Sequence, residues 1–186
     1  AADWPTIRRT WPLLMAYGAV GYALFNMFLY VGLQTTTGVN SAIEQASLPM
    51  LILGANFIVF RVRARPIQIA GVLLAIFGVM LTATHGDPRR ILTLDVNVGD
   101  GFVILACLAY TTYTLALRFR PRMHIMSFMA VSFSGAAITG VIMLALFGGG
   151  LGQVATLTHA SPTVWAVIAY VAIFPSMFSQ VAYARG

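Results

Sequence analysis

Long apolar runs separated by short polar connectors dominate the pattern of this chain. Six of these runs each approach the roughly 20 residues that a helix needs to cross the hydrocarbon core of a bilayer. Inside a bilayer each backbone amide must be satisfied within its own segment, and none of the runs alternates as a barrel strand does. The pattern therefore predicts an all-α, polytopic membrane helix bundle. Its predicted spans cover residues 11–33, 39–60, 67–84, 101–117, 126–147 and 164–184.

The connectors carry residues that are typical of turns. Arg-rich segments containing proline follow the second and fourth runs, at residues 61–66 and 118–122. The longest loop begins at His85-Gly86-Asp87-Pro88, and three glycines at 148–150 open the loop before the sixth run. We expect Asp100 to cap the helix that starts beside it.

Composition excludes a water-soluble globule. Hydrophobic residues make up 59% of the chain, charged residues only 9%, and the mean hydropathy is +0.85, whereas a soluble domain has roughly a quarter charged residues. The net charge of +6 comes from eleven arginines, since lysine is absent. These lie in short clusters between apolar runs, which indicates topology signals rather than a nucleic-acid-binding face.

Arginine placement predicts the orientation. When six spans are threaded, nine of the eleven arginines fall on one side. The positive-inside rule makes that side cytoplasmic, in a multi-pass protein of the plasma membrane, here a bacterial inner membrane. Arg89 and Arg90 are the exceptions, and they share their loop with Asp87, Asp95 and Asp100.

Catalytic and metal chemistry finds little support in these residues. Cys107 is the single cysteine, so there is no disulfide framework and no Cys/His metal spacing. Gly99-Asp100 is similar to the glycine-aspartate of intramembrane aspartyl proteases, but no second aspartate lies within a span. We expect no catalytic residue, no metal and no cofactor. An intramembrane enzyme or a membrane assembly subunit remains the alternative of another class.

The first and sixth runs resemble one another at an offset of 153 residues. Tyr17 corresponds to Tyr170, and Phe25 to Phe178. Under the predicted orientation these two spans run in opposite directions, which is the mark of inverted-topology repeats in transporters. Each half would then hold five helices, and the parent protein ten. Residues 1–97 would end the first repeat and 98–186 begin the second, with about two helices missing at each end.

Two segments resemble a known family. Val39–Leu81 carries Ser47-Leu48-Pro49 and later Gln68, Gly71 and Gly78-Val79, and the segment around Gly99-Asp100-Gly101 continues through Tyr110 and Tyr113. These segments resemble EamA-type members of the drug/metabolite transporter superfamily. One departure is the turn Arg63-Ala64-Arg65, where family members often carry an acidic residue.

The resemblance implies ten helices in two inverted five-helix repeats that move small metabolites by alternating access. Aromatic amino-acid exporters are one branch, and the Tyr-rich spans favour it. A nucleotide-sugar or phosphosugar carrier of the same superfamily is the alternative. The absence of arginine or lysine in the middle of any span disfavours such anionic ligands.

Polar residues recur along one face of the first run. Tyr22, Asn26 and Tyr30 follow Gly18 at intervals of four residues, so they form a stripe on a helix. At the 153-residue offset the stripe returns in the sixth run. These positions could line a cavity for a small-molecule substrate, or serve as interhelical hydrogen bonds and headgroup-level aromatics. The corresponding residues are Pro175, Ser179 and Tyr183, with Gln180 beside them.

Glu44 is the only acidic residue inside an apolar run. An ionisable group there costs about 2–3 kcal/mol, so it should face a cavity or a partner. With Asn40 and Ser47 it forms a second polar stripe. Two interpretations stand: a substrate-amine or proton-coupling site, with protons as the candidate coupling ion, or a side chain that reaches the nearby membrane surface.

Two further groups complete the predicted site. Tyr110 and Tyr113 lie on one helical face and are expected to wall the cavity. Pro49 and Pro175 interrupt their runs and are candidate hinges, or kinks without function. Together with the resemblance to the drug/metabolite transporters, these residues predict a secondary transporter that exports small metabolites such as amino acids, aromatic ones favoured. Its partners would be the substrate, membrane lipid and protons, and not nucleic acid.

Overall fold

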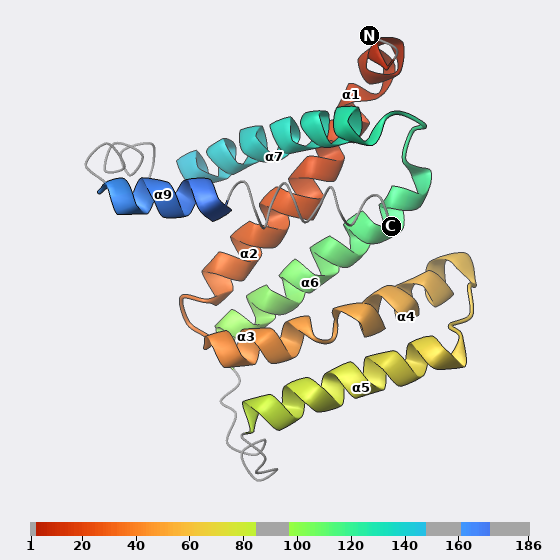
Figure 1. Cartoon of the computed structure of the whole chain (residues 1–186), viewed down its shortest axis with the longest axis vertical. Coiled ribbons are helices and arrows are strands. Elements are labelled where there is room, and N and C mark those ends of the chain that lie inside the picture. Colours follow the sequence, from red (N-terminus) through yellow and green to blue (C-terminus); the bar gives the residue numbers. More distant parts are fainter. Residues whose placement is uncertain (1–2, 85–96, 148–160, 172–186) are drawn as a thin grey trace.

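The computed structural model describes residues 3–84, 97–147 and 161–171, and every regular element within these ranges is a helix (Figure 1). The first half holds α1 (Trp4–Gly18), the π-helical turn η1 (Ala19–Leu24), α2 (Phe25–Gly32), α3 (Gly38–Gln45), α4 (Leu48–Phe60) and α5 (Pro66–Ala83). The second half holds α6 (Val98–Ala116), the short 3-10 helix η3 (Leu117–Phe119), α7 (Ile125–Phe147) and α9 (Pro162–Val171).

Among the described residues, four helical segments are long and apolar enough to cross a bilayer, which confirms the polytopic helix bundle. They are Trp4–Gly32, Gly38–Phe60, Val98–Phe119 and Ile125–Leu146, with 29, 23, 22 and 22 residues. They match the first, second, fourth and fifth predicted spans. The third predicted span is the helix α5, whose apolar part Pro66–Thr82 is slightly shorter. The sixth is described only through Val171.

The first span is longer than its apolar run because a helix can continue beyond the bilayer. It begins at Trp4 instead of Trp11 and includes the charged pair Arg8-Arg9. Its 29 residues correspond to about 43 Å of helix, which exceeds the roughly 30 Å of a hydrocarbon core. The continuous helix is also interrupted by η1, a wider π turn that the apolar pattern did not predict.

The second span consists of two helices. α3 ends at Gln45, and α4 begins at Leu48 with Pro49 in its first turn. Proline lacks the N–H that a helix interior needs, but it is well suited to a first turn. The Ser47 hydroxyl donates to the Glu44 carbonyl oxygen at 2.6 Å across this break. The residue expected to act as a hinge therefore lies directly after a real interruption.

The cap of α6 differs from the prediction. Asn97, and not Asp100, is the N-cap, and its side chain accepts a hydrogen bond from the Gly99 N–H at 2.7 Å. Asp100 lies at the third helical position and accepts the Asn97 N–H at 2.7 Å. The two residues form a reciprocal capping box, so the helix starts three residues earlier than expected.

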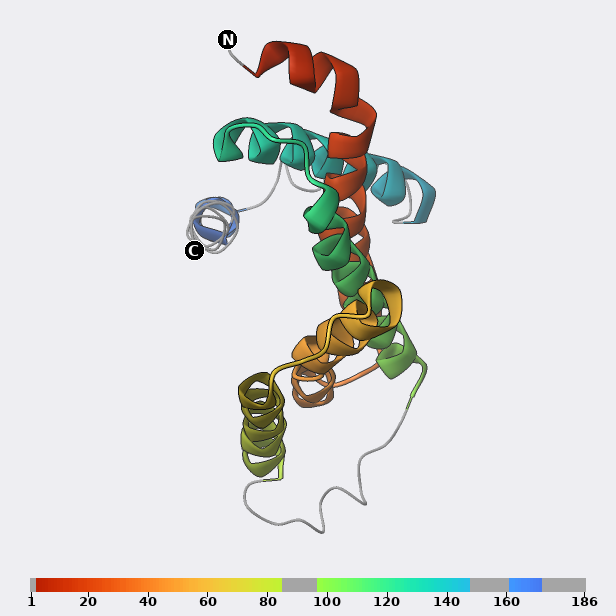
Figure 2. The ribbon, with the colours of Figure 1, turned by 90° about the vertical axis from the view of Figure 1, so that its right-hand side faces the viewer.

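The helices are arranged in a row that Figures 1 and 2 show from two sides. α7 crosses α1 and η1, α6 packs against η1 and α2, and α3 and α4 pack on another side of α6. α5 is outermost and lies against α3. A cluster of buried apolar side chains lies between α1, α6 and α7. It consists of Leu14, Tyr17, Tyr113, Phe128 and Met129.

Small residues bring α1 and α7 into backbone contact. A Cβ at Gly18 would overlap the carbonyl oxygen of Ser132, a residue that is fully buried. A Cβ at Gly135 would lie 2.6 Å from the Met15 backbone. Close approach over small residues is how helices pack where lipid removes the hydrophobic driving force. On α7 the contact with Gly18 is thus made by the small residue Ser132.

Large apolar side chains cover much of the outer surface. Ile58, Ile67 and Leu74 are each more than 70% exposed. An apolar surface of this kind is unfavourable in water and favourable against lipid tails. This exposed apolar surface agrees with the high hydrophobic content of the sequence.

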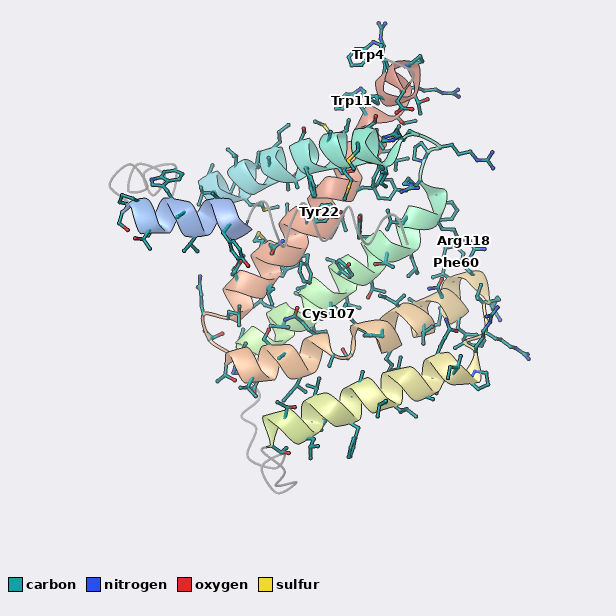
Figure 3. All side chains as sticks on the ribbon, in the orientation of Figure 1. Trp4, Trp11, Tyr22, Phe60, Cys107 and Arg118 are labelled. Atoms are coloured by element: carbon teal, nitrogen blue, oxygen red, sulfur yellow. The ribbon has the colours of Figure 1, made fainter. Side chains whose placement is uncertain are left out.

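Three Arg-bearing segments meet at one end of the bundle. The Arg118 guanidinium lies 4.8 Å from the centre of the Phe60 ring, where α4 ends, and Figure 3 shows the two side chains together. Asp3 accepts hydrogen bonds from the His124 N–H at 3.2 Å and the Ser127 hydroxyl at 2.7 Å. The start of α1, the α4–α5 connector and the α6–α7 connector therefore share one end.

Candidate functional site

A cavity of about 560 Å³ lies between the first span and α7. Tyr22, Asn26 and Tyr30 line it from one side, and Ala136 and Gly140 from the other. The three polar residues are the stripe expected from sequence, and the structure brings them to one cavity. Gly140 has open space where a side chain would point, so the small residues of α7 leave room here.

The π turn η1 lies at the inner part of this stripe. It covers Ala19–Leu24 and so includes Tyr22. A π turn inserts an extra residue into the helical repeat, and such turns are frequent at functional sites. Next to it, the Asn26 side-chain amide donates to the Tyr22 carbonyl oxygen at 2.8 Å. That bond orients the Asn26 side chain and uses one of its two amide hydrogens.

Aromatic rings pack against one another where the first span meets α6, beside the cavity. The hydroxyls of Tyr22 and Tyr113 are hydrogen-bonded at 2.9 Å, with their ring centres 5.4 Å apart. Tyr110 packs on Tyr113 at 5.8 Å and on Phe25 at 5.3 Å. Tyr113 is almost fully buried, and neither Tyr110 nor Tyr113 lines the cavity, so the expectation that they wall it is wrong; Tyr113 contacts Tyr22, which does line it. Figure 3 shows Tyr22 midway along the first span.

Tyr30 occupies the other end of the cavity. Its side chain is 63% exposed, so it lies at the rim. At the rim it is suited to contact an entering ligand and also to lie at the level of the lipid headgroups. These are the two interpretations that the sequence allowed.

Glu44 faces a second acid. Its carboxyl group lies close enough to the Asp100 carboxyl for the two to interact, although the two residues are 56 positions apart. Asp100 is buried, with a residual exposure of 5%. The Thr36 hydroxyl donates to its Oδ1, and the Asn97 N–H to its Oδ2. Both oxygens of Asp100 are thus fixed.

The carboxyl group of Glu44 makes fewer hydrogen bonds than that of Asp100. Its Oε2 is buried and has no hydrogen-bond partner among the described residues. The Cys107 thiol lies 4.0 Å from the Glu44 carbonyl oxygen, and Figure 3 labels this cysteine on α6. Two carboxyl groups in contact cannot both be charged without a large cost, so such a pair is suited to hold one proton.

The other members of the Glu44 stripe support the ends of α3. The Asn40 N–H donates to the Thr37 hydroxyl oxygen at 3.1 Å, where the helix begins. Ser47 closes the opposite end through its bond to Glu44. The Glu44 group packs against α6, whereas the cavity lies between the first span and α7. The structure therefore forms two separate polar groups from the two stripes.

Four predicted positions, Pro175, Ser179, Gln180 and Tyr183, lie outside the described residues. In the ranges that are described, no group of three or more histidine, cysteine, aspartate or glutamate side chains converges as a metal site would.

Sequence reasoning missed Thr36 and the role of Asp100 as the neighbour of Glu44. The local signal was the capping sequence Asn97-x-x-Asp100, which places a carboxylate in the first turn of a helix. The contact with Glu44 depends on how α3 and α6 cross. Just before α3 in the chain, the end of α2 packs closely on the start of α6, where a Cβ at Gly32 would lie only 2.7 Å from the Gly99 carbonyl oxygen.

Known proteins resemble this chain along most of its length. Residues 2–84 match the family described as the EamA-like transporter family. The Uncharacterized transporter YyaM of Bacillus subtilis (strain 168) is 26% identical over 170 residues, covering 91% of this chain and 54% of that protein. The Uncharacterized transporter YetK of the same organism is 27% identical over 169 residues, covering 90% and 50%. The chain thus spans about half the length of these curated relatives. No solved structure matches it.

Proposed function

We propose that this chain, whose residues 2–84 match the EamA-like transporter family, belongs to a secondary transporter that exports small metabolites across the plasma membrane by alternating access. The proposed substrates are amino acids, with aromatic ones favoured. The observation that carries this proposal is the cavity in which Tyr22, Asn26 and Tyr30 line one wall.

The chemistry of the cavity supports an amphipathic substrate. Its volume of about 560 Å³ falls within the roughly 300–1,000 Å³ of small-molecule sites. Aromatic rings at Tyr22 and Tyr30 offer surfaces on which an apolar side chain packs, and the Asn26 amide offers a polar group. No arginine lines the cavity among the residues the structure describes. This disfavours the nucleotide-sugar or phosphosugar alternative, because a phosphate group calls for a cation.

Protons are the proposed coupling ion, held by Glu44 beside Asp100. Support comes from the contact between the two carboxyl groups and from the buried Glu44 Oε2 that lacks a partner. In this proposal Asp100 is a positioning residue, fixed by Thr36 and the Asn97 N–H.

The ten-helix inverted repeat is retained as part of the proposal. It is supported by the relatives, which are about twice as long as the stretch they share with this chain. The proposed division at residues 97–98 falls after the end of the family match at residue 84. Orientation with the Arg-bearing ends in the cytoplasm is supported by the meeting of three such segments at one end.

Counterflow of radiolabelled phenylalanine in vesicles that contain the full-length protein tests the proposed function. Asn26→Ala should lower uptake about tenfold, the effect of losing a contact of about 1.4 kcal/mol. Ser134→Ala is a matched control, since this exposed serine bonds only to its own helix at Ala130. Absence of phenylalanine counterflow in the unaltered protein would contradict the proposal that aromatic amino acids are substrates. Equal uptake by the Asn26 and Ser134 variants would contradict the site.

A further inference from the structure

A second hollow lies outside the proposed transport path, between α4 and α5. This groove has a volume of about 460 Å³. Met50, Leu53 and Phe57 line it from α4, and Ile69 and Leu73 from α5. Its side chains are exposed: Met50 by 60% and Leu73 by 62%. From Met50 to Phe57 it extends about 10 Å along α4, the length of part of an acyl chain.

One end of the groove carries a cation. Arg63, in the connector between the two helices, is part of the groove lining. The backbone of its neighbours is constrained. Arg61 ends α4 in a left-handed conformation, and the Arg65 N–H donates to the Gln68 side-chain oxygen at 2.8 Å. Between Glu44 and Asp87 the sequence contains no acidic residue. The three arginines of the connector therefore lack a local counter-charge.

We propose that this groove binds an anionic phospholipid, with an acyl chain between α4 and α5 and the phosphate headgroup at Arg63. An apolar channel that ends in a cation at the membrane surface is complementary to this ligand at both ends. Apolar walls alone would accept any lipid tail. Arg63 adds the preference for a negative headgroup, since a guanidinium pairs with phosphate through several directed hydrogen bonds.

Gly54 is where the groove can be filled without disturbing the fold. It lines the groove, and no atom lies within 4 Å of the position that its Cβ would occupy. Gly78 on α5 has the same open surroundings but is not part of the lining. Gly54→Leu and Gly78→Leu are thus a matched pair, of which only the first blocks the acyl chain.

Native mass spectrometry of the full-length protein, released from nanodiscs of mixed phosphatidylcholine and phosphatidylglycerol, tests the proposal. The unaltered protein should retain phosphatidylglycerol preferentially. Arg63→Gln should weaken that retention about fivefold, whereas Arg122→Gln removes the same charge from another connector and should not. Gly54→Leu should reduce retention, and Gly78→Leu should leave it unchanged.

Equal retention of the two lipids by the unaltered protein would overturn the proposal, as would an Arg63→Gln variant that keeps the preference. An unchanged result for Gly54→Leu would show that the headgroup binds without the groove. A photo-crosslinking amino acid at position 57, in place of Phe57, separates the remaining occupants. Crosslinks to lipid support the proposal, and crosslinks to a second copy or to another segment of the same protein contradict it.

Discussion

The hydroxyl groups of Tyr22 and Tyr113 lie 2.9 Å apart and join the π turn of the first span to α6. Tyr22 lines the cavity, whereas Tyr113 is 6% exposed and belongs to the buried cluster. This bond therefore connects the proposed substrate site to the buried cluster. Any movement that closes the cavity around a ligand has to keep or exchange it.

A double-mutant cycle measures that connection. Tyr22→Phe and Tyr113→Phe each remove one hydroxyl and preserve the ring packing. We expect each to lower the free energy of unfolding in detergent by about 0.5–1.5 kcal/mol, with a coupling energy near 0.6 kcal/mol. Tyr30→Phe, at the exposed rim, is the control and should have little effect. Strictly additive losses in the double variant would mean that the two hydroxyls do not interact.

Filling the cavity should stop transport without unfolding the protein. A side chain at Gly140 meets open space, so Gly140→Phe should occupy the volume that the substrate needs. We expect counterflow to fall to background while thermal stability stays within a few degrees of the unaltered protein. Gly71→Phe places the same bulk on α5, where it also meets open space. Transport that survives in the Gly140 variant would place the substrate path elsewhere.

The crossing of α1 and α7 should be intolerant of even one methyl group. Gly18→Ala forces a Cβ into the Ser132 carbonyl, which we expect to cost about 1–3 kcal/mol of stability. Gly101→Ala, on α6 with no neighbour near its Cβ position, is the matched control and should be neutral or slightly stabilising. The measurement is thermal unfolding of both variants in the same detergent, and equal melting temperatures would refute the close crossing.

The pH dependence of transport should change when the carboxyl pair is altered. Glu44→Gln removes the proposed exchangeable proton, so uptake should become nearly independent of pH from about pH 5 to pH 8. Asp100→Asn keeps hydrogen-bonding oxygen for Thr36 but removes the facing charge, and should shift the pH profile without abolishing it. Cys107→Ala, which alters a neighbour that is not an acid, should leave the profile unchanged. An unaltered profile in Glu44→Gln would exclude this residue from coupling.

The Asp3 contact should be lost in acid. The hydrogen bond from the Ser127 hydroxyl, with help from the His124 N–H, lowers the pKa of Asp3 below its ordinary value of 3.8. Because the folded-state pKa is the lower one, its stabilising effect is complete above pH 3.8 and is lost as the pH falls through the folded value. Hydrogen exchange of the first turn of α7, corrected for intrinsic rates, should accelerate below about pH 4. Asp3→Asn should remove this acid-dependent step, and an identical step in that variant would assign it to another group.

Much of the fold could be predicted because lipid imposes a length and a composition on each span. The span that contains Val39 and Phe60 was placed to within one residue. Pro49 indicated the break in that span, because proline lacks the backbone N–H that a helix interior needs. The start of the first span could not be placed from hydropathy, because Arg8 and Arg9 are compatible with a helix that extends beyond the bilayer.

The site was predictable where its residues share one helix. Tyr22, Asn26 and Tyr30 recur at a helical interval, so their common face followed from geometry alone. The π turn beside them has no such periodic signature. The contact between Glu44 and Asp100 was not predictable either, because it depends on the angle at which α3 and α6 cross. The sequence around Asp100 indicated only that this residue lies near the start of a helix.

The backbone contact between Gly18 and Ser132 is a point about which the first span can rotate relative to α7. Helices that interlock through long side chains resist rotation, whereas helices whose backbones approach over small residues, here at Gly18 and Gly135, can rotate about their crossing. Tyr30 is 12 residues from Gly18, which corresponds to a lever arm of about 18 Å. A rotation of roughly 10° at the crossing would then move the rim of the cavity by about 3 Å relative to α7. A movement of this size would widen or narrow the cavity at Tyr30, as the proposed alternating access requires.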